Sequence, residues 1–142
     1  MKNERPSAIT KILSRNDTGE TGGHQAGILV PRNLQVLSFF PSLDRATKNP
    51  RHLLLFTDTL GESWSFAFIY YNNTFFGGTR NEYRLTRMTP YLRSRNLKAG
   101  DRITLRRDTN GQYTIECTQQ HQSRRGSDGV LHLGTGWKVI RI

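Results

Sequence analysis

Apolar and polar residues alternate along much of this chain, with the two-residue period of strands that bury one face. The clearest case is residues 63–71, in which every second side chain is aromatic: Trp64, Phe66, Phe68 and Tyr70. Residues 52–58 have a similar β-favouring composition, and a loop containing Gly61 separates the two runs. The pattern predicts two strands whose aromatic side chains form a core. A platform that stacks single-stranded nucleic acid is the less favoured interpretation.

The second half of the chain continues this β pattern. A turn at residues 108–111 separates two further predicted strands, at residues 102–107 and 112–117. Residues 137–142 return to strand character and are expected to close a barrel. Residues 118–136 are polar and contain several glycines, and their composition leaves their role open.

Short helices and turns fill the remaining segments. Helices are expected within residues 32–40, which Pro41 ends, and within residues 88–96. Residues 1–10 are expected to be a flexible N-terminus, and residues 11–14 a short strand or helix. Because no repeat and no hinge rich in Pro, Gly or Ser divides the chain, we predict one mainly β domain over residues 1–142.

Charge indicates the kind of partner. The chain carries 21 Lys and Arg against 11 Asp and Glu, which gives a net charge of +10. This balance favours a nucleic acid, with an anionic membrane surface as the competitor. The 16 Arg and 5 Lys residues favour bidentate recognition of guanine or phosphate. No apolar run approaches the ~18 residues of a membrane span, and the single cysteine suits a reducing cytoplasm.

A loop rich in glycine and small polar residues is predicted at residues 15–27. Its candidate contacts for base edges and phosphates are Arg15, Asn16, Asp17, Thr18, Thr21, His24 and Gln25. The alternative is a connecting loop whose Asn and Asp side chains bond only to their own backbone. The residues alone do not choose between these interpretations.

A second candidate site follows the aromatic strand. On an extended segment Arg80, Glu82 and Arg84 share one side, and Asn81 and Tyr83 the other. Arg donates two hydrogen bonds to guanine and Glu accepts one from cytosine, so the three together suit G·C pairs in the major groove. A surface strand with weak ion pairs is the alternative.

Residues on either side of this segment complete the candidate set. Arg87 is a candidate phosphate contact. Four aromatic residues are expected to position the segment rather than touch DNA: Tyr70, Tyr71, Phe75 and Phe76.

Sequence motifs argue against catalysis by this chain. None of the residues two positions before a lysine is acidic, so the carboxylate–lysine pattern of metal-dependent nucleases is missing. The sequence also contains no His-x-Lys, and no Gly-Lys-Ser or Gly-Lys-Thr. Cys117, His121 and His132 lack a fourth clear ligand for zinc. A binding protein without a metal or cofactor of its own is therefore predicted.

Two motifs carry a family resemblance. Residues 16–27 (NDTGETGGHQAG) and 77–84 (GGTRNEYR) resemble the N-terminal effector and DNA-binding domain of EcoRII-type restriction endonucleases. That resemblance implies the DNA-binding pseudobarrel fold shared with plant B3 domains. It also implies a clamp of two arms in the major groove, in which His24, Arg80, Glu82 and Arg84 match residues implicated in DNA binding.

The resemblance implies further expectations. These are the target 5′-CCWGG-3′ (W is A or T), a prokaryotic cytoplasm, and a nuclease domain elsewhere in the full-length protein that alone would need Mg²⁺. Three positions depart from the EcoRII pattern: Leu29 replaces Tyr, and Gly78 and Tyr83 replace lysines. A standalone B3-like regulator with another target is the main alternative. A carbohydrate- or RNA-binding barrel and a small hydrolase are less well supported.

Overall fold

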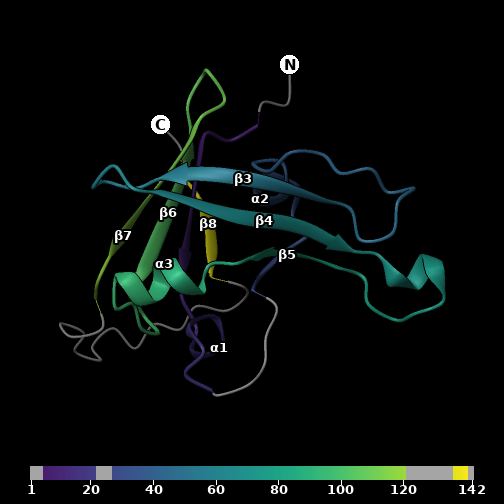
Figure 1. Cartoon of the computed structure of the whole chain (residues 1–142), viewed down its shortest axis with the longest axis horizontal. Helices are drawn as coiled ribbons and strands as arrows, with labels where there is room; N and C mark the ends of the chain where they lie inside the picture. The colour runs from purple at the N-terminus through teal and green to yellow at the C-terminus, as the bar shows by residue number, and fades with distance from the viewer. Residues whose placement is uncertain (1–4, 22–26, 121–135, 141–142) are drawn as a thin grey trace.

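A single curved sheet of eight strands forms the body of the protein (Figure 1). The computed structural model describes residues 5–21, 27–120 and 136–140. Along the chain the strands are β1 (Ala8–Ile12), β2 (Ile28–Val30), β3 (Arg51–Thr57), β4 (Ser63–Tyr71), β5 (Glu82–Thr86), β6 (Arg102–Arg107), β7 (Tyr113–Thr118) and β8 (Trp137–Val139). Within the sheet their order is β2-β5-β4-β3-β7-β6-β1-β8.

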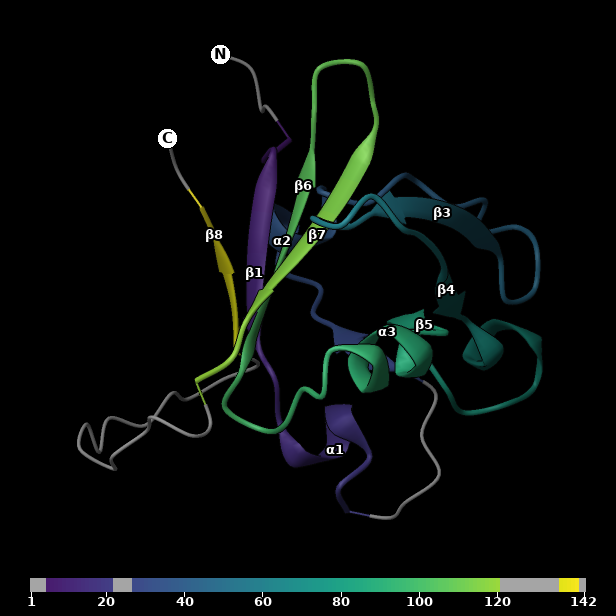
Figure 2. The ribbon, with the colours of Figure 1, turned by 60° about the vertical axis from the view of Figure 1, so that its left-hand side comes forward.

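The sheet consists of two halves that cross steeply. In Figure 1, strands β3, β4 and β5 run roughly horizontally, whereas β1, β6, β7 and β8 run roughly vertically. Figure 2 shows the second group side by side. Neighbouring strands are antiparallel within each half, and the parallel pair β3 and β7 joins the halves. This bend gives the sheet the shape of a partly opened barrel.

Short helices sit at the connections. They are α1 (Arg15–Thr18), α2 (Leu34–Leu37), α3 (Thr89–Ser94) and the 3-10 helix η1 (Asn73–Phe76). In Figure 1, α1 lies below the sheet and η1 lies beyond the end of β4. No helix in the described part of the chain is long and apolar enough to cross a membrane.

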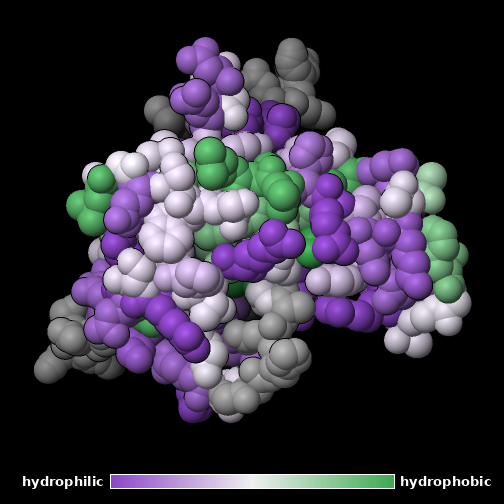
Figure 3. Space-filling model, in the orientation of Figure 1, coloured by the Kyte–Doolittle hydropathy of each residue, from purple (hydrophilic) through white to green (hydrophobic). Residues whose placement is uncertain are grey.

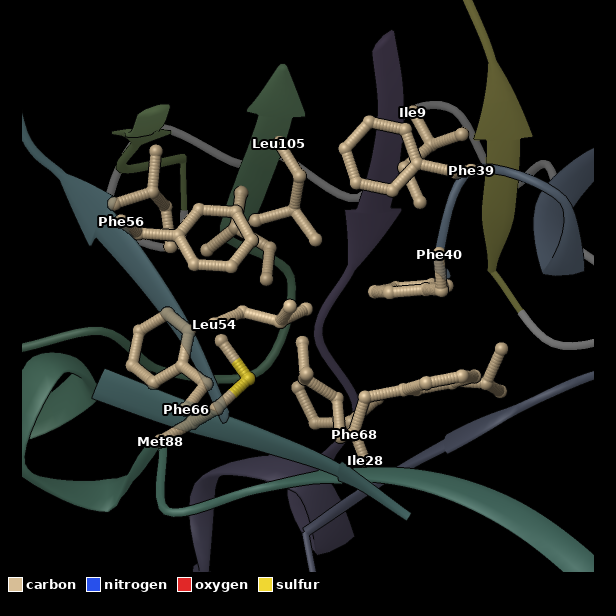
Figure 4. Close-up of a cluster of buried hydrophobic side chains, with 14 of the residues drawn as sticks. Ile9, Ile28, Phe39, Phe40, Leu54, Phe56, Phe66, Phe68, Met88 and Leu105 are labelled. Carbon is tan, nitrogen blue, oxygen red and sulfur yellow. The ribbon is translucent and has the colours of Figure 1, made fainter. Parts of the chain in front are cut away.

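The core fills the space between the two halves. Figure 4 shows side chains from both halves pointing into it, among them Phe56 and Phe66 on one side and Ile9 and Leu105 on the other. All four are fully buried. The predicted aromatic face of residues 63–71 is confirmed as core, because Phe66, Phe68 and Tyr70 are all at most 3% exposed.

The two edge strands of the sheet are linked by a side chain. Trp137 in β8 donates a hydrogen bond from Nε1 to the carbonyl of Leu29 in β2, at 2.9 Å. Since β2 and β8 stand at opposite ends of the strand order, this bond brings the ends of the sheet together.

The predicted fold class, mainly β with short helices, is confirmed, and several boundaries differ. The N-terminal strand begins at Ala8, so the expectation of a flexible N-terminus is wrong for residues 8–10, which are buried. Residues 15–18 form helix α1 rather than loop. Helix α2 covers only Leu34–Leu37 of the predicted 32–40.

Candidate nucleic-acid interface

Three charged residues line one side of β5 and the turn before it. Arg80 Nη2 lies 3.0 Å from Glu82 Oε2, and Arg84 Nε lies 2.6 Å from the same oxygen. Their side chains are 42%, 31% and 18% exposed in the order Arg80, Glu82, Arg84. The predicted sharing of one side by these three residues is therefore confirmed.

Glu82 is held as a carboxylate by its two neighbours. Partial burial raises the pKa of Glu82, but hydrogen bonds from Arg84 and Arg80 and their positive charges outweigh it and lower the pKa. The group is thus ionised at neutral pH, when it accepts hydrogen bonds but cannot donate them. Such an acceptor between two guanidinium donors suits the edges of G·C pairs.

Tyr71 supports the exposed end of this row. The Arg80 guanidinium lies over the Tyr71 ring, 4.0 Å from its centroid. Tyr71 in β4 is paired with Glu82 in β5 across the two neighbouring strands. The two residues that contact the Arg80 guanidinium therefore lie next to each other in the sheet. A cation held over an aromatic face is attracted to it and loses rotational freedom, so Arg80 is oriented before any ligand binds.

Arg84 connects this strand to the segment that contains α1. Its Nη1 donates a hydrogen bond to the Gly27 carbonyl at 2.8 Å. The backbone at Gly27 approaches β5 so closely that a Cβ atom there would lie 2.3 Å from the Leu85 carbonyl oxygen. The base of the predicted residue 15–27 arm is therefore locked against the strand of the other arm.

The opposite side of β5 faces the core. Tyr83 is buried, and its ring stacks on Tyr70 with centroids 4.3 Å apart. Arg45 donates a hydrogen bond to the Tyr83 hydroxyl at 3.2 Å. We correct the expected contact role of Tyr83, because its side chain is enclosed by the fold and lies opposite Arg80.

Asn81 is also engaged within the protein. Its Oδ1 accepts hydrogen bonds from the Tyr70 hydroxyl, at 2.7 Å, and from Arg32, which also bonds to the Asn81 carbonyl. Arg32 lies over the Tyr70 and Tyr83 rings as well. Arg32 and Arg45 were not predicted as site residues, since neither belongs to the two sequence motifs. Their contacts assign Asn81 a role in positioning the strand.

Helix α1 begins the other arm, and Asp17 stabilises its start. Ser14 Oγ accepts a hydrogen bond from the Asp17 backbone N–H, and the Asp17 carboxylate accepts one from the Ser14 backbone. The same carboxylate lies 2.9 Å from Lys11 Nζ, and both side chains are less than 10% exposed. Asp17 was expected to contact DNA, and this stays a prediction, with a carboxylate that is only 9% exposed and paired with Lys11 in the fold.

Other polar residues of α1 and of the segment after it lie on this predicted arm. Glu20 Oε2 accepts hydrogen bonds from Thr18 Oγ1, at 2.6 Å, and from the Ala99 N–H, at 2.8 Å. These bonds lower the pKa of Glu20 and tie the arm to the turn before β6. Arg15 and Asn16 are exposed, as is Thr21, whose hydroxyl donates to Asn16 Oδ1. His24 and Gln25, at the predicted tip, lie outside the described residues.

A hollow lies beside the contact between the bases of the two predicted arms. It has a volume of about 210 Å³ and is lined by Asp17 and Gly27 from one arm and by Tyr71, Thr86 and Arg87 from the other. Arg87 is exposed and has a φ of +68°, which is uncommon outside glycine. The hollow is a concave surface between the bases of the two predicted arms, and Arg87 is one of its lining residues.

The aromatic residues around η1 divide into two groups. Tyr70 is buried and Tyr71 half-buried, as expected for positioning residues. Phe75 and Phe76 were expected to do the same, and this is wrong: they are 68% and 43% exposed. Within the described residues, no three His, Cys, Asp or Glu side chains come together as a metal site.

Comparisons with known proteins identify relatives of this chain. The family described as "Restriction endonuclease EcoRII, N-terminal" matches residues 3–125. The type II restriction enzyme EcoRII of Escherichia coli is 41% identical over 99 residues, which are 67% of this chain and 24% of the enzyme. Auxin response factor 10 of Oryza sativa subsp. indica is 29% identical over 140 residues, 96% of this chain and 19% of that protein.

A solved structure supports the fold. The B3 domain of the UbaLAI restriction endonuclease, solved with cognate DNA, aligns with a TM-score of 0.58 and 22% sequence identity. The alignment covers 96% of this chain and 87% of that domain. The predicted B3-like pseudobarrel is thereby confirmed. The chain spans only about a quarter, or less, of the full-length relatives that it matches.

Proposed function

Because this chain belongs to the family of the N-terminal domain of restriction endonuclease EcoRII, we propose that it binds double-stranded DNA and recognises a specific sequence. The observation that carries the proposal is the row of Arg80, Glu82 and Arg84, fixed on one strand and joined through Arg84 to Gly27 of the second arm. Two donors around one acceptor match G·C edges in the major groove.

Binding begins with charge. A net charge of +10 attracts the phosphate backbone, so the affinity for any duplex falls as salt rises. Arg15, Asn16, Thr21 and Arg87 are exposed, and in this proposal they contact phosphates and base edges together with His24 and Gln25. Thr18 and the exposed Asn81 belong to the same proposed contact set, whereas the nearly buried Asp17 and Tyr83 hold the arms in place.

Sequence is then read in the groove. We propose 5′-CCWGG-3′ as the target, with the β5 row reading G·C pairs and the arm of residues 15–27 reading the other half of the site. Each good bidentate contact discriminates against a wrong base by roughly 1 to 3 kcal/mol. DNA cleavage, with its Mg²⁺ requirement, belongs in this proposal to a separate nuclease domain of a full-length restriction enzyme.

The test is binding of a short CCWGG duplex and a scrambled duplex of equal composition, by fluorescence anisotropy at near-physiological salt. We expect a preference of about a hundredfold or more for the wild-type chain. Glu82→Ala should abolish most of this preference. Glu116→Ala is the matched control, because Glu116 also accepts a hydrogen bond from an arginine, Arg106, but on β6 and β7. A Glu82→Ala variant that kept its preference would contradict the proposal.

A second candidate is a regulator that binds a different sequence without a linked nuclease. The match to the plant auxin response factor over 96% of the chain favours it. Selection from random duplexes tests the target, and a nuclease domain encoded in the same full-length protein separates the restriction enzyme from the regulator.

A further inference from the structure

Two phenylalanines are exposed at the tip of the arm that consists of the end of β4, η1 and the start of β5. Phe75 and Phe76 lie in η1, none of whose residues is buried. Figure 3 shows a hydrophobic patch at the end of the molecule where Figure 1 places η1, next to a hydrophilic surface. Two adjacent phenyl rings exposed on one turn are available for an apolar contact with a ligand.

The turn that carries these rings is held firmly. The Thr74 N–H donates to the Arg80 carbonyl at 3.0 Å, and the Gly78 N–H donates to the Asn73 carbonyl at 2.8 Å. A Cβ atom at Gly78 would lie 2.8 Å from Asn73 Cβ, so the two ends of the turn touch. The rings are therefore presented by a closed, bonded turn.

A buried asparagine anchors the turn to the body of the protein. Asn72 is fully buried, and its Oδ1 accepts a hydrogen bond from the Asn49 N–H at 2.7 Å. Its Nδ2 donates to the Thr47 carbonyl at 2.9 Å. These bonds fix the start of η1, the turn that carries Phe75 and Phe76.

The backbone bond between Thr74 and Arg80 joins the turn that carries the two phenylalanines to the outer end of the charged row. From the base of the arm outward, the order is Arg84, Glu82, Arg80 and then the two phenyl rings. The charged residues suit G·C pairs, whereas an apolar ring suits the one apolar group on the major-groove edge of a base pair, the C5 methyl of thymine. The arm thus carries, one after the other, charged residues that suit G·C pairs and apolar rings that suit a thymine methyl group.

We propose that Phe75 and Phe76 form a subsite for the thymine methyl group next to the G·C pairs read by Arg80 and Glu82. The inference rests on the proposed function and deepens it. In CCWGG the two G·C pairs of each half-site are followed by the central A·T pair, which is the same order of chemistry as along the arm. The rings would explain discrimination of the central W pair from G·C, because G·C carries no methyl group there.

The experiment compares thymine with uracil, which differs only by the missing methyl. Three duplexes are needed: CCWGG, the same duplex with uracil at the central position, and a control with uracil outside the site. Wild-type binding should weaken about fourfold for central uracil, the size expected for one buried methyl group, and should be unchanged for uracil outside the site. The double variant Phe75→Ala, Phe76→Ala should bind thymine and uracil duplexes equally.

Leu60→Ala serves as the matched control. Leu60 is 70% exposed like Phe75, but it lies in the turn at the opposite end of β4, so its variant should keep the wild-type response to uracil. Equal wild-type binding of the two CCWGG duplexes would overturn the inference while leaving the proposed function intact. A double variant that still prefers thymine would overturn it too. Failure of the wild type to prefer CCWGG over a scrambled duplex would instead refute the proposed target and the inference together.

Discussion

The guanidinium of Arg84 donates a hydrogen bond to the Gly27 carbonyl at 2.8 Å, and through this bond the two arms of the concave surface meet. The same guanidinium holds Glu82 through Nε. A shift of Gly27 would therefore be transmitted to the carboxylate that stands between the two arginines. We infer that the spacing of the arms and the geometry of the charged row are set together.

The first prediction concerns Gly27→Ala. The new Cβ would lie 2.3 Å from the Leu85 carbonyl oxygen, and the φ of +85° is strained for alanine. We expect the clash and the strain together to lower the free energy of unfolding by more than about 2 kcal/mol, measured by urea denaturation. Preference for the target duplex should fall as well, because Arg84 loses the position of its acceptor.

Gly61→Ala separates the clash from the strain. Gly61 has nearly the same φ, +86°, but a Cβ there meets nothing within 4 Å. Its variant should lose only about 1 kcal/mol, the cost of a left-handed alanine. Equal losses in the two variants would show that the close approach at Gly27 is unimportant.

The second prediction concerns the tyrosine under Arg80. Tyr71→Phe keeps an aromatic face beneath the guanidinium, whereas Tyr71→Leu removes it. We expect Tyr71→Leu to weaken binding of the target duplex about threefold to thirtyfold, since cation–π contacts are worth about 0.5 to 2 kcal/mol. Tyr71→Phe should bind almost as the wild type does.

Modified DNA tests whether Tyr71 acts through Arg80. Replacing guanine by 7-deazaguanine removes the N7 acceptor that an arginine uses. At the guanine read by Arg80, the loss caused by Tyr71→Leu should shrink on the modified duplex. An undiminished loss there would mean that Tyr71 contributes to binding by a route other than Arg80.

The sequence predicts those parts of the fold and site that depend on local periodicity. The aromatic alternation of β4 and the shared side of Arg80, Glu82 and Arg84 both follow from the two-residue repeat of a strand. The hairpin of β6 and β7 follows from a turn between two β-favouring runs.

Contacts between distant segments are not encoded in this way. Even the pairing of Asp17 with Lys11, six positions away in the sequence, has no sign in the pattern of residues 15–27. Phe75 and Phe76 resemble core residues by composition, and only the position of η1 at the end of the arm makes them exposed. Arg32 reaches Asn81 across 49 positions of sequence, a contact that no local motif indicates.

The third prediction is a loss of stability in acid through Asp58. Burial raises the pKa of Asp58, but hydrogen bonds from Trp64, Glu62 and Leu60 and the charge of Arg95 outweigh it, and the pKa is lowered from its ordinary 3.8. Stabilisation by a carboxylate with a lowered pKa is complete above 3.8 and is lost as the pH falls through the folded-state value.

Denaturation at a series of pH values measures this effect. The free energy of unfolding of the wild type should fall steeply below about pH 4. Asp58→Asn should be less stable at pH 7, because it lacks the charge that Arg95 pairs with, and its decline in acid should be shallower. Parallel curves for the two proteins would exclude Asp58 as a source of the acid sensitivity.

The last prediction concerns the closure of the barrel by Trp137. Trp137→Phe keeps an aromatic ring near Phe40 but removes the N–H that bonds to the Leu29 carbonyl. We expect a loss of about 1 to 3 kcal/mol, from one hydrogen bond and a smaller side chain. Hydrogen exchange should show the opening first in the amides of β2 and β8, because those strands end the sheet.

Trp64→Phe is the comparison, since Trp64 Nε1 also donates a hydrogen bond, but from interior strand β4 to Asp58. If both variants accelerated exchange in β2 and β8 equally, the bond between Trp137 and Leu29 would have no special part in closing the barrel.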